Sequence, residues 1–144
     1  MDDKKVRILV ATDGSNNSER AIVAAKTHGE CVDGEITLLT VMKPVNTTYY
    51  GNISLSKIDD ENIEASKQEL LEDALEMMEG YTGEVKTKLR KGNPADEILE
   101  ESQEGGYDLI VMGSRGLGAF SRTILGSVSN KVLNHTDTNV LTIK

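Results

Sequence analysis

A buried strand and the turn that ends it are encoded in residues 6–15, which read Val6-Arg7-Ile8-Leu9-Val10-Ala11-Thr12-Asp13-Gly14-Ser15. The first six residues are rich in branched apolar side chains, which is typical of a buried strand. The last four are residue types that favour turns, so they end the strand. We therefore expect a strand over 6–11, followed by a helix over 16–29 that ends at Gly29.

The alternation of strand-like and helix-like segments continues to the end of the chain. Further strands are expected over 35–42, 84–90, 107–112 and 139–143, and further helices over 58–79, from Pro94 to Gly105-Gly106, and over 126–135. A long polar loop, 43–57, follows the second strand. This alternation predicts an α/β fold, in which a doubly wound open sheet of five mainly parallel strands carries helices on both faces. The charged alternation of 84–90 indicates an edge strand, and the apolar run 107–112 indicates an internal one.

Size and charge limit the classes of function. The chain has 144 residues and no break in composition, so we expect a single domain over 1–144. Its 16 basic and 24 acidic side chains give a net charge of −8, which argues against nucleic acid or an anionic membrane as a partner. The charge is uneven, however, because residues 58–80 carry −8 and residues 105–144 carry +2. We interpret the acidic segment as the solvated face of an amphipathic helix, which leaves the C-terminal quarter suited to a small anionic ligand.

Membrane, secreted and multi-cysteine classes are not indicated. No apolar run is long enough to span a membrane, and the N-terminus has no features of a secretory signal, so we expect a cytoplasmic protein. Cys31 is the single cysteine, which excludes a disulfide framework. The two histidines, His28 and His135, are far apart in the sequence and do not indicate a metal site.

A glycine-rich segment follows the strand 107–112. Four glycines fall within 14 residues, and three of them form the pattern G-x-x-G-x9-G-S. Gly113 permits a sharp turn and a close approach to the backbone, and Gly116 lets backbone amides form an anion-binding nest. Gly126-Ser127 opens a helix whose first amides have no partner within the helix and carry partial positive charge. Arg115 and Arg122 add positive charge, so the segment predicts a phosphate-binding loop.

The segment has other possible interpretations besides phosphate binding. The loop could simply connect a strand to a helix. The P-loop pattern G-x-x-x-x-G-K-[ST] is absent, and G-x-G-x-x-G is broken because Ser121 occupies the third glycine position. The sequence therefore supports neither a P-loop hydrolase nor a dinucleotide-dependent dehydrogenase.

Taken together, these segments resemble the universal stress protein family, and in particular its ATP-binding branch. The resemblance covers nearly the whole chain, and its most specific part is Met112-Gly113-Ser114-Arg115-Gly116 with Gly126-Ser127-Val128-Ser129. It implies a five-stranded sheet of order 3-2-1-4-5. Because family members that keep the glycine motif typically bind ATP, it also implies an ATP-binding regulatory protein of the stress response.

The resemblance assigns roles to individual residues. It implies that Ala11, Thr12 and Asp13 lie against the adenosine, that Val41 contacts the adenine edge, and that Met112 and Gly113 lie under the ribose. The phosphates would be surrounded by the remaining motif residues, which are Arg115, Gly116, Gly126, Ser127, Val128 and Ser129. A Mg²⁺ or Mn²⁺ ion is expected to bridge the phosphate oxygens, with Asp13 as the nearest candidate ligand.

No arrangement of residues in the sequence indicates a complete catalytic site. Asp13 offers a carboxylate and Arg115 a cation, but hydrolysis also needs a positioned water and a base. Two alternatives stay open: a slow ATPase or phosphotransferase that uses the same pocket, and a protein-interaction module without a ligand. The resemblance further implies a homodimer formed through the last strand, where Asn139 replaces a proline found in many relatives, and a regulatory protein partner.

Overall fold

Five parallel strands form one sheet of order β3-β2-β1-β4-β5. The computed structural model describes residues 4–44, 53–115 and 125–144, with the backbone alone for residues 53–59. The strands are β1 (Arg7–Ala11), β2 (Glu35–Met42), β3 (Val85–Lys91), β4 (Leu109–Gly113) and β5 (Asn139–Ile143). This order confirms the predicted fold, with β3 at an edge and β4 between β1 and β5.

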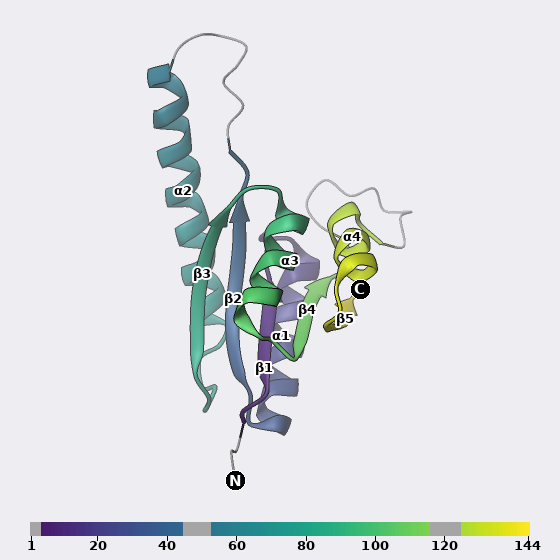
Figure 1. Cartoon of the computed structure of the whole chain (residues 1–144). Coiled ribbons are helices and arrows are strands. Elements are labelled where there is room, and N and C mark those ends of the chain that lie inside the picture. The colour runs from purple at the N-terminus through teal and green to yellow at the C-terminus, as the bar shows by residue number, and fades with distance from the viewer. Residues whose placement is uncertain (1–3, 45–52, 116–124) are drawn as a thin grey trace.

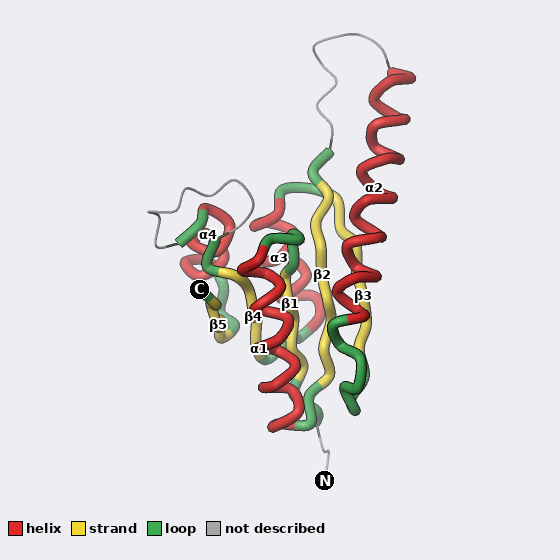
Figure 2. Tube along the Cα trace, turned by 180° about the vertical axis from the view of Figure 1, so that it is seen from behind, coloured by secondary structure: helices red, strands yellow, loops and turns green. Residues whose placement is uncertain are grey.

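Helices cover both faces of the sheet. On one face lie α1 (Asn16–Val32) and α2 (Ile53–Glu76), and on the other lie α3 (Pro94–Gly105) and α4 (Ser127–His135), as Figures 1 and 2 show from opposite sides. In the parts of the chain that the structure describes, no helix is both long enough and apolar enough to cross a membrane.

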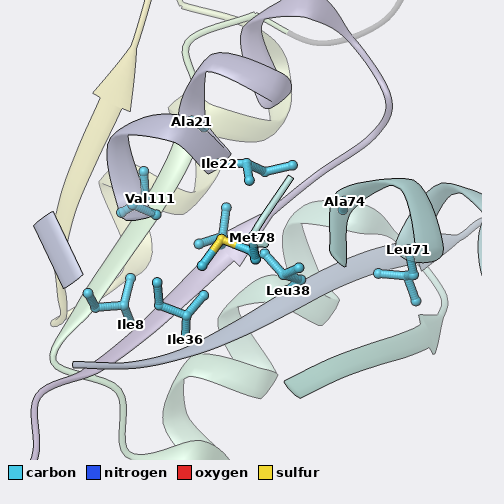
Figure 3. Packing of buried hydrophobic residues seen from close by; sticks show 11 residues of the cluster. Ile8, Ala21, Ile22, Ile36, Leu38, Leu71, Ala74, Met78 and Val111 are labelled. Carbon is cyan, nitrogen blue, oxygen red and sulfur yellow. The ribbon is translucent and has the colours of Figure 1, made fainter. Parts of the chain in front are cut away.

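The two faces of the sheet form two apolar clusters because successive side chains of a strand point to opposite faces. Ile8 and Ile36 belong to the cluster under α1 and α2, which Figure 3 shows together with Ile22 of α1. Leu9 and Ile110 belong to the cluster under α3 and α4. These side chains are at most 1% exposed, and burial of each contributes roughly 1.5–3 kcal/mol to stability.

The end of α1 differs from the prediction. Gly29 does not end the helix, which continues to Val32 and leaves the helical conformation at Asp33, a residue with a φ of 52°. Gly29 is buried beside Tyr81 and Ile36, and a Cβ atom at this position would collide with the Tyr81 hydroxyl. Glycine is therefore needed here for close packing and not for a turn.

The helix α2 begins earlier than expected, at Ile53, so the predicted loop 43–57 is too long. Helix propagation is cooperative, which favours extension of a well-formed helix into a polar segment. Its apolar stripe meets the sheet through Leu71 and Ala74, and Met78, in the turn that follows the helix at Glu76, joins them; each is at most 4% exposed. The acidic residues of α2 from 61 to 76 are all exposed, so this part of the acidic segment is a solvated helix face, whereas Asp60 is half-buried and pairs with Lys91.

Candidate functional site

The strands β1 and β4 are neighbours, and their carboxyl ends lie at the same edge of the sheet. Val10 and Val111 form the last register pair between the two strands, so Ala11 and Met112, which follow them, lie where β1 and β4 part. The strand order reverses between β1 and β4, because the chain passes from β1 to β2 on one side and returns to β4 on the other. In open α/β sheets this switch point is where ligands bind.

The turn after β1 is held by a set of short-range hydrogen bonds. The Asp13 carboxylate accepts the Ser15 N–H at 2.9 Å, and the Ser15 hydroxyl in turn accepts the Ser18 N–H at 3.2 Å, which caps α1. Thr12 is 5% exposed, and its hydroxyl lies 3.2 Å from that of Ser18. The Thr12 side chain therefore points towards α1, whereas the Asp13 side chain remains half-exposed at the strand end.

Ser114 joins four elements at the end of β4. Its N–H donates to the Ile143 carbonyl of β5 at 2.7 Å, and its carbonyl accepts the N–H of Gly126 at the start of α4. The Ser129 hydroxyl lies 2.9 Å from the same carbonyl oxygen, and the Asn17 amide of α1 lies 3.4 Å from the Ser114 hydroxyl. Sequence reasoning assigned no role to Ser114 or Asn17, although Ser114 lies inside the glycine motif.

The first turn of α4 differs from the starts of α1 and α3. Ser15 caps α1 and Asn93 caps α3, in each case by accepting a backbone N–H of the first turn. At α4 the capping position is Gly126, and no side chain caps this turn within the described chain. The first amides of a helix have no carbonyl partner inside it and carry partial positive charge. This turn can therefore accept an anion at the switch point.

Four of the predicted site residues share one apolar cluster, the one under α3 and α4. Val41 and Met112 are buried in it, and Ala11 and Val128 pack against it with partial exposure; together they join the ends of β1, β2 and β4 to the first turn of α4. The carboxyl edge of the sheet thus carries an apolar surface beside an uncapped helix N-terminus.

The remaining predicted residues divide into two groups. Gly113 and Arg115 are described, and both are partly buried at the end of β4. Gly116, together with Arg122, lies outside the described residues, as does most of the loop between the motif glycines. The structure therefore describes the two ends of the glycine motif, at β4 and at α4.

A hollow that reaches Thr12 and Gly14 at the end of β1 has a different character. A cleft of about 290 Å³ lies between α1 and α2, on the opposite face of the sheet from α4. Glu19, Glu69 and Asp73 line it, so its charge is unsuited to phosphates. Within residues 4–44, 53–115 and 125–144, no group of three or more His, Cys, Asp or Glu side chains could hold a metal ion.

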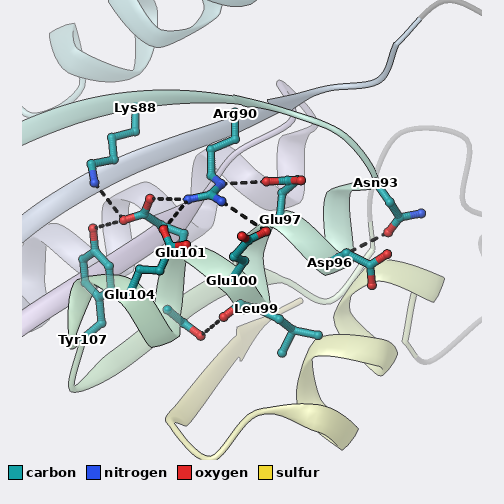
Figure 4. A network of polar contacts seen from close by, with 11 residues as sticks. Lys88, Arg90, Asn93, Asp96, Glu97, Leu99, Glu100, Glu101, Glu104 and Tyr107 are labelled. Carbon is teal, nitrogen blue, oxygen red and sulfur yellow. Dashed lines mark hydrogen bonds and ion pairs between the residues drawn. The ribbon is translucent and has the colours of Figure 1, made fainter.

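A polar network fastens α3 to the edge strand β3 (Figure 4). Arg90 forms ion pairs with four glutamates of α3, among them Glu97 at 2.7 Å and Glu101 at 3.0 Å. Glu101 is 2% exposed and also accepts hydrogen bonds from Lys88 and Tyr107. Burial raises the pKa of Glu101, but the hydrogen bonds from Lys88, Tyr107 and Arg90 outweigh it and leave this pKa below its ordinary value. The network holds α3, whose apolar side packs on the cluster that contains Val41.

Comparisons with known proteins agree with this architecture. The model of the universal stress protein family matches residues 6–144. Universal stress protein YxiE of Bacillus subtilis (strain 168) is 30% identical over 145 residues, which cover 96% of this chain and 98% of the relative. The solved structure of MJ0577, a universal stress protein of Methanocaldococcus jannaschii, is 25% identical, with a TM-score of 0.85 over 96% of this chain and 95% of the other.

A further solved structure carries a ligand. It is a universal stress protein in complex with cAMP, and it is 25% identical to this chain, with a TM-score of 0.72 over 96% of both chains. The family match extends over nearly the whole sequence, and the strand order, the switch point and the described ends of the glycine motif lie within it. The chain belongs to the universal stress protein family.

Proposed function

We propose that this universal stress protein is a cytoplasmic regulatory protein that binds ATP at the switch point between β1 and β4. The observation that carries the proposal is the uncapped first turn of α4, which begins at Gly126 and is hydrogen-bonded to the end of β4. In this proposal the phosphates lie at that turn, and the base and ribose lie on the adjoining apolar surface.

The apolar surface supports the binding of an adenine ring. Val41 and Met112 provide a largely buried floor, and Ala11 and Val128 flank it with partial exposure. The half-exposed carboxylate of Asp13 at the end of β1 can accept hydrogen bonds from ribose hydroxyls. The relative solved with cAMP shows that a member of the family accepts an adenine nucleotide.

The first turn of α4 supports the binding of phosphates. The backbone N–H groups of Ser127, Val128 and Ser129 are the first three of the helix. A hydrogen bond to a charged group contributes roughly 1.5–3 kcal/mol. Three such bonds, together with a buried adenine, can approach the roughly −8 kcal/mol that a micromolar dissociation constant requires, although association itself has a cost. A dedicated lysine is therefore not needed.

The divalent ion of the proposal enters with the nucleotide. Asp13, at the end of β1, is the candidate carboxylate ligand, and its side chain already accepts the Ser15 N–H. A single carboxylate does not make a protein-held site for Mg²⁺ or Mn²⁺, which take several oxygen ligands. In the proposal the ion is therefore held mainly by phosphate oxygens and water, and it neutralises part of the phosphate charge.

The proposal also includes assembly and partners. The edge strand β5 is paired on one side with β4, and Leu141 on it is 37% exposed. Asn139 pairs in register with Leu109, so the strand forms with asparagine at this position. We expect two copies of the chain to associate through β5, and nucleotide occupancy to alter the affinity for a regulatory protein partner.

Binding is tested by native mass spectrometry of freshly purified protein and by calorimetry with Mg-ATP. We expect a bound adenine nucleotide, or micromolar affinity for Mg-ATP. A protein that carries no nucleotide and binds none at millimolar Mg-ATP would show that the proposal is wrong.

A substitution at the capping position tests the location of the phosphates. In Gly126→Asp a carboxylate would cap the first turn of α4, occupy its amides and repel the phosphates. We expect ATP affinity to fall at least tenfold. The matched control is Asn130→Asp, which adds the same charge at an exposed position of the same helix without a capping role. Equal losses in both variants would argue against phosphates at this turn.

The enzymatic alternative has its own test. We expect Mg-ATP to be recovered intact after incubation with the protein for minutes. Release of phosphate on that timescale, abolished in Asp13→Ala while ATP binding persists, would instead support a slow ATPase.

A further inference from the structure

The Ser129 hydroxyl is engaged within the protein. Ser129 is 2% exposed, and its hydroxyl oxygen lies 2.9 Å from the Ser114 carbonyl oxygen and 3.1 Å from that of Gly126. A serine hydroxyl has one proton to donate, and both of these acceptors are backbone carbonyls of the chain. The Ser127 side chain, two residues earlier, is exposed.

Two donors from the start of α4 converge on one acceptor. The Ser114 carbonyl accepts the Gly126 N–H as well as the Ser129 hydroxyl. Ser114 is itself fixed to β5, because its N–H donates to the Ile143 carbonyl at 2.7 Å. The first turn of α4 is thus tied to the sheet through one buried peptide group at the end of β4.

We propose that Ser129 is a positioning residue, whose hydroxyl holds the first turn of α4 against the Ser114 carbonyl and does not contact the phosphates. The inference rests on the proposed function and deepens it. The groups of this turn left for the ligand are then its backbone N–H groups, including that of Ser129 itself, and the exposed Ser127 hydroxyl. The bond from the Ser129 hydroxyl to the Ser114 carbonyl sets the direction in which these N–H groups point. A change in that direction would weaken their hydrogen bonds to the phosphates, because a hydrogen bond weakens steeply as its angle departs from linear.

This role predicts a particular pattern of affinities. The phosphates depend on the amides of the first turn of α4, whereas the base and ribose rest mainly on the ends of β1, β2 and β4, with Val128 alone contributed by that turn. Loss of the Ser129 hydroxyl should therefore weaken binding of ATP and leave binding of adenosine unchanged. A general loss of folding would weaken both ligands together.

The test compares Ser129→Ala with Ser102→Ala by calorimetry, using Mg-ATP and adenosine, with thermal unfolding as the check on folding. Ser102 is the matched control because it is a helix serine, 3% exposed, whose hydroxyl donates 2.8 Å to the carbonyl of Leu99 three residues earlier. This bond is local, unlike the bond from Ser129 to Ser114, which joins two elements. We expect about tenfold weaker ATP binding in Ser129→Ala, adenosine affinity within twofold in both variants, and recovery of ATP affinity in Ser129→Thr.

A structure of the wild-type protein with Mg-ATP completes the test. We expect the Ser129 hydroxyl to remain on the Ser114 carbonyl, and a hydroxyl moved to a phosphate oxygen would overturn the inference. It would also be overturned if wild-type protein bound ATP and Ser129→Ala behaved as Ser102→Ala does, or lost ATP and adenosine equally. Failure of the wild type to bind any adenine nucleotide would instead overturn the proposed function, and this inference with it.

Discussion

Gly113 lies so close to Asn17 that a Cβ atom on Gly113 would come within 2.8 Å of the Asn17 Cβ atom. The same added atom would lie 3.0 Å from the carbonyl carbon of Asn17 and 3.1 Å from the Ser18 nitrogen. The end of β4 is therefore pressed against the first turn of α1. The first glycine of the motif has a packing role that does not depend on any ligand.

Replacement of Gly113 should destabilise the protein even without a nucleotide. In Gly113→Ala the new methyl group meets backbone atoms that cannot rotate away, so we expect a loss of about 1–3 kcal/mol in the free energy of unfolding. Urea denaturation of the ligand-free protein measures it. Gly80→Ala is the comparison. Gly80 has a φ of 85°, and an added Cβ there would have no atom within 4 Å. The loss of stability in Gly80→Ala therefore measures backbone strain without a steric collision. A Gly113→Ala variant as stable as the wild type would contradict the packing role.

Gly116, the second glycine of the motif, lies outside the described residues, and its prediction follows from the sequence pattern. In Gly116→Val a branched side chain would block the approach of phosphates to the backbone amides. We expect ATP affinity to fall at least tenfold, about 1.4 kcal/mol, with thermal stability unchanged. Gly118→Val is the matched control, since Gly118 is not part of G-x-x-G-x9-G-S. If calorimetry found equal affinities for the two variants, the nest would be misassigned.

Most of the fold could be predicted from local sequence. The apolar strands, the capping residues Ser15 and Asn93, and the left-handed Gly106 after α3 each act within a few residues of their position in the chain. The end of α1 could not be predicted in this way. Gly29 resembles a helix stop in the sequence, but its neighbour Tyr81 is distant in the chain, and only the folded protein brings the two together.

The candidate site could be predicted only in part, again because some of its contacts join residues that are distant in the chain. The ends of β1 and β4 and the first turn of α4 could be located from strand periodicity and from the glycine pattern. The role of Ser114 could not, because three of its four hydrogen bonds use its backbone groups, and the fourth joins its hydroxyl to Asn17, which is distant in the chain. A backbone carbonyl has no residue type to signal it, so the sequence places Ser129 among the residues around the phosphates and gives no indication that its hydroxyl is bonded to the Ser114 carbonyl.

The network around Glu101 predicts a pH dependence of stability. The folded-state pKa of Glu101 lies below its ordinary value of 4.5, because hydrogen bonds from Lys88, Tyr107 and Arg90 outweigh the effect of burial. A carboxyl group whose pKa is lowered by folding stabilises the folded state when it is ionised in both states. This contribution is fully present above the unfolded-state pKa, near 4.5, and is lost as the pH falls through the lower, folded-state pKa.

Glu101→Gln removes the titrating charge but keeps an oxygen that can accept a hydrogen bond. At pH 7 we expect a loss of about 1.5–3 kcal/mol in unfolding free energy, the range for hydrogen bonds to charged groups. Below pH 4.5 the wild type loses the same contribution by protonation, so the difference between wild type and variant should shrink. Urea denaturation from pH 7 to pH 3.5 measures this difference, and Glu64→Gln, at an exposed position of α2, is the control. A difference that stays constant over the whole pH range would mean that the Glu101 carboxylate does not stabilise the fold through its charge.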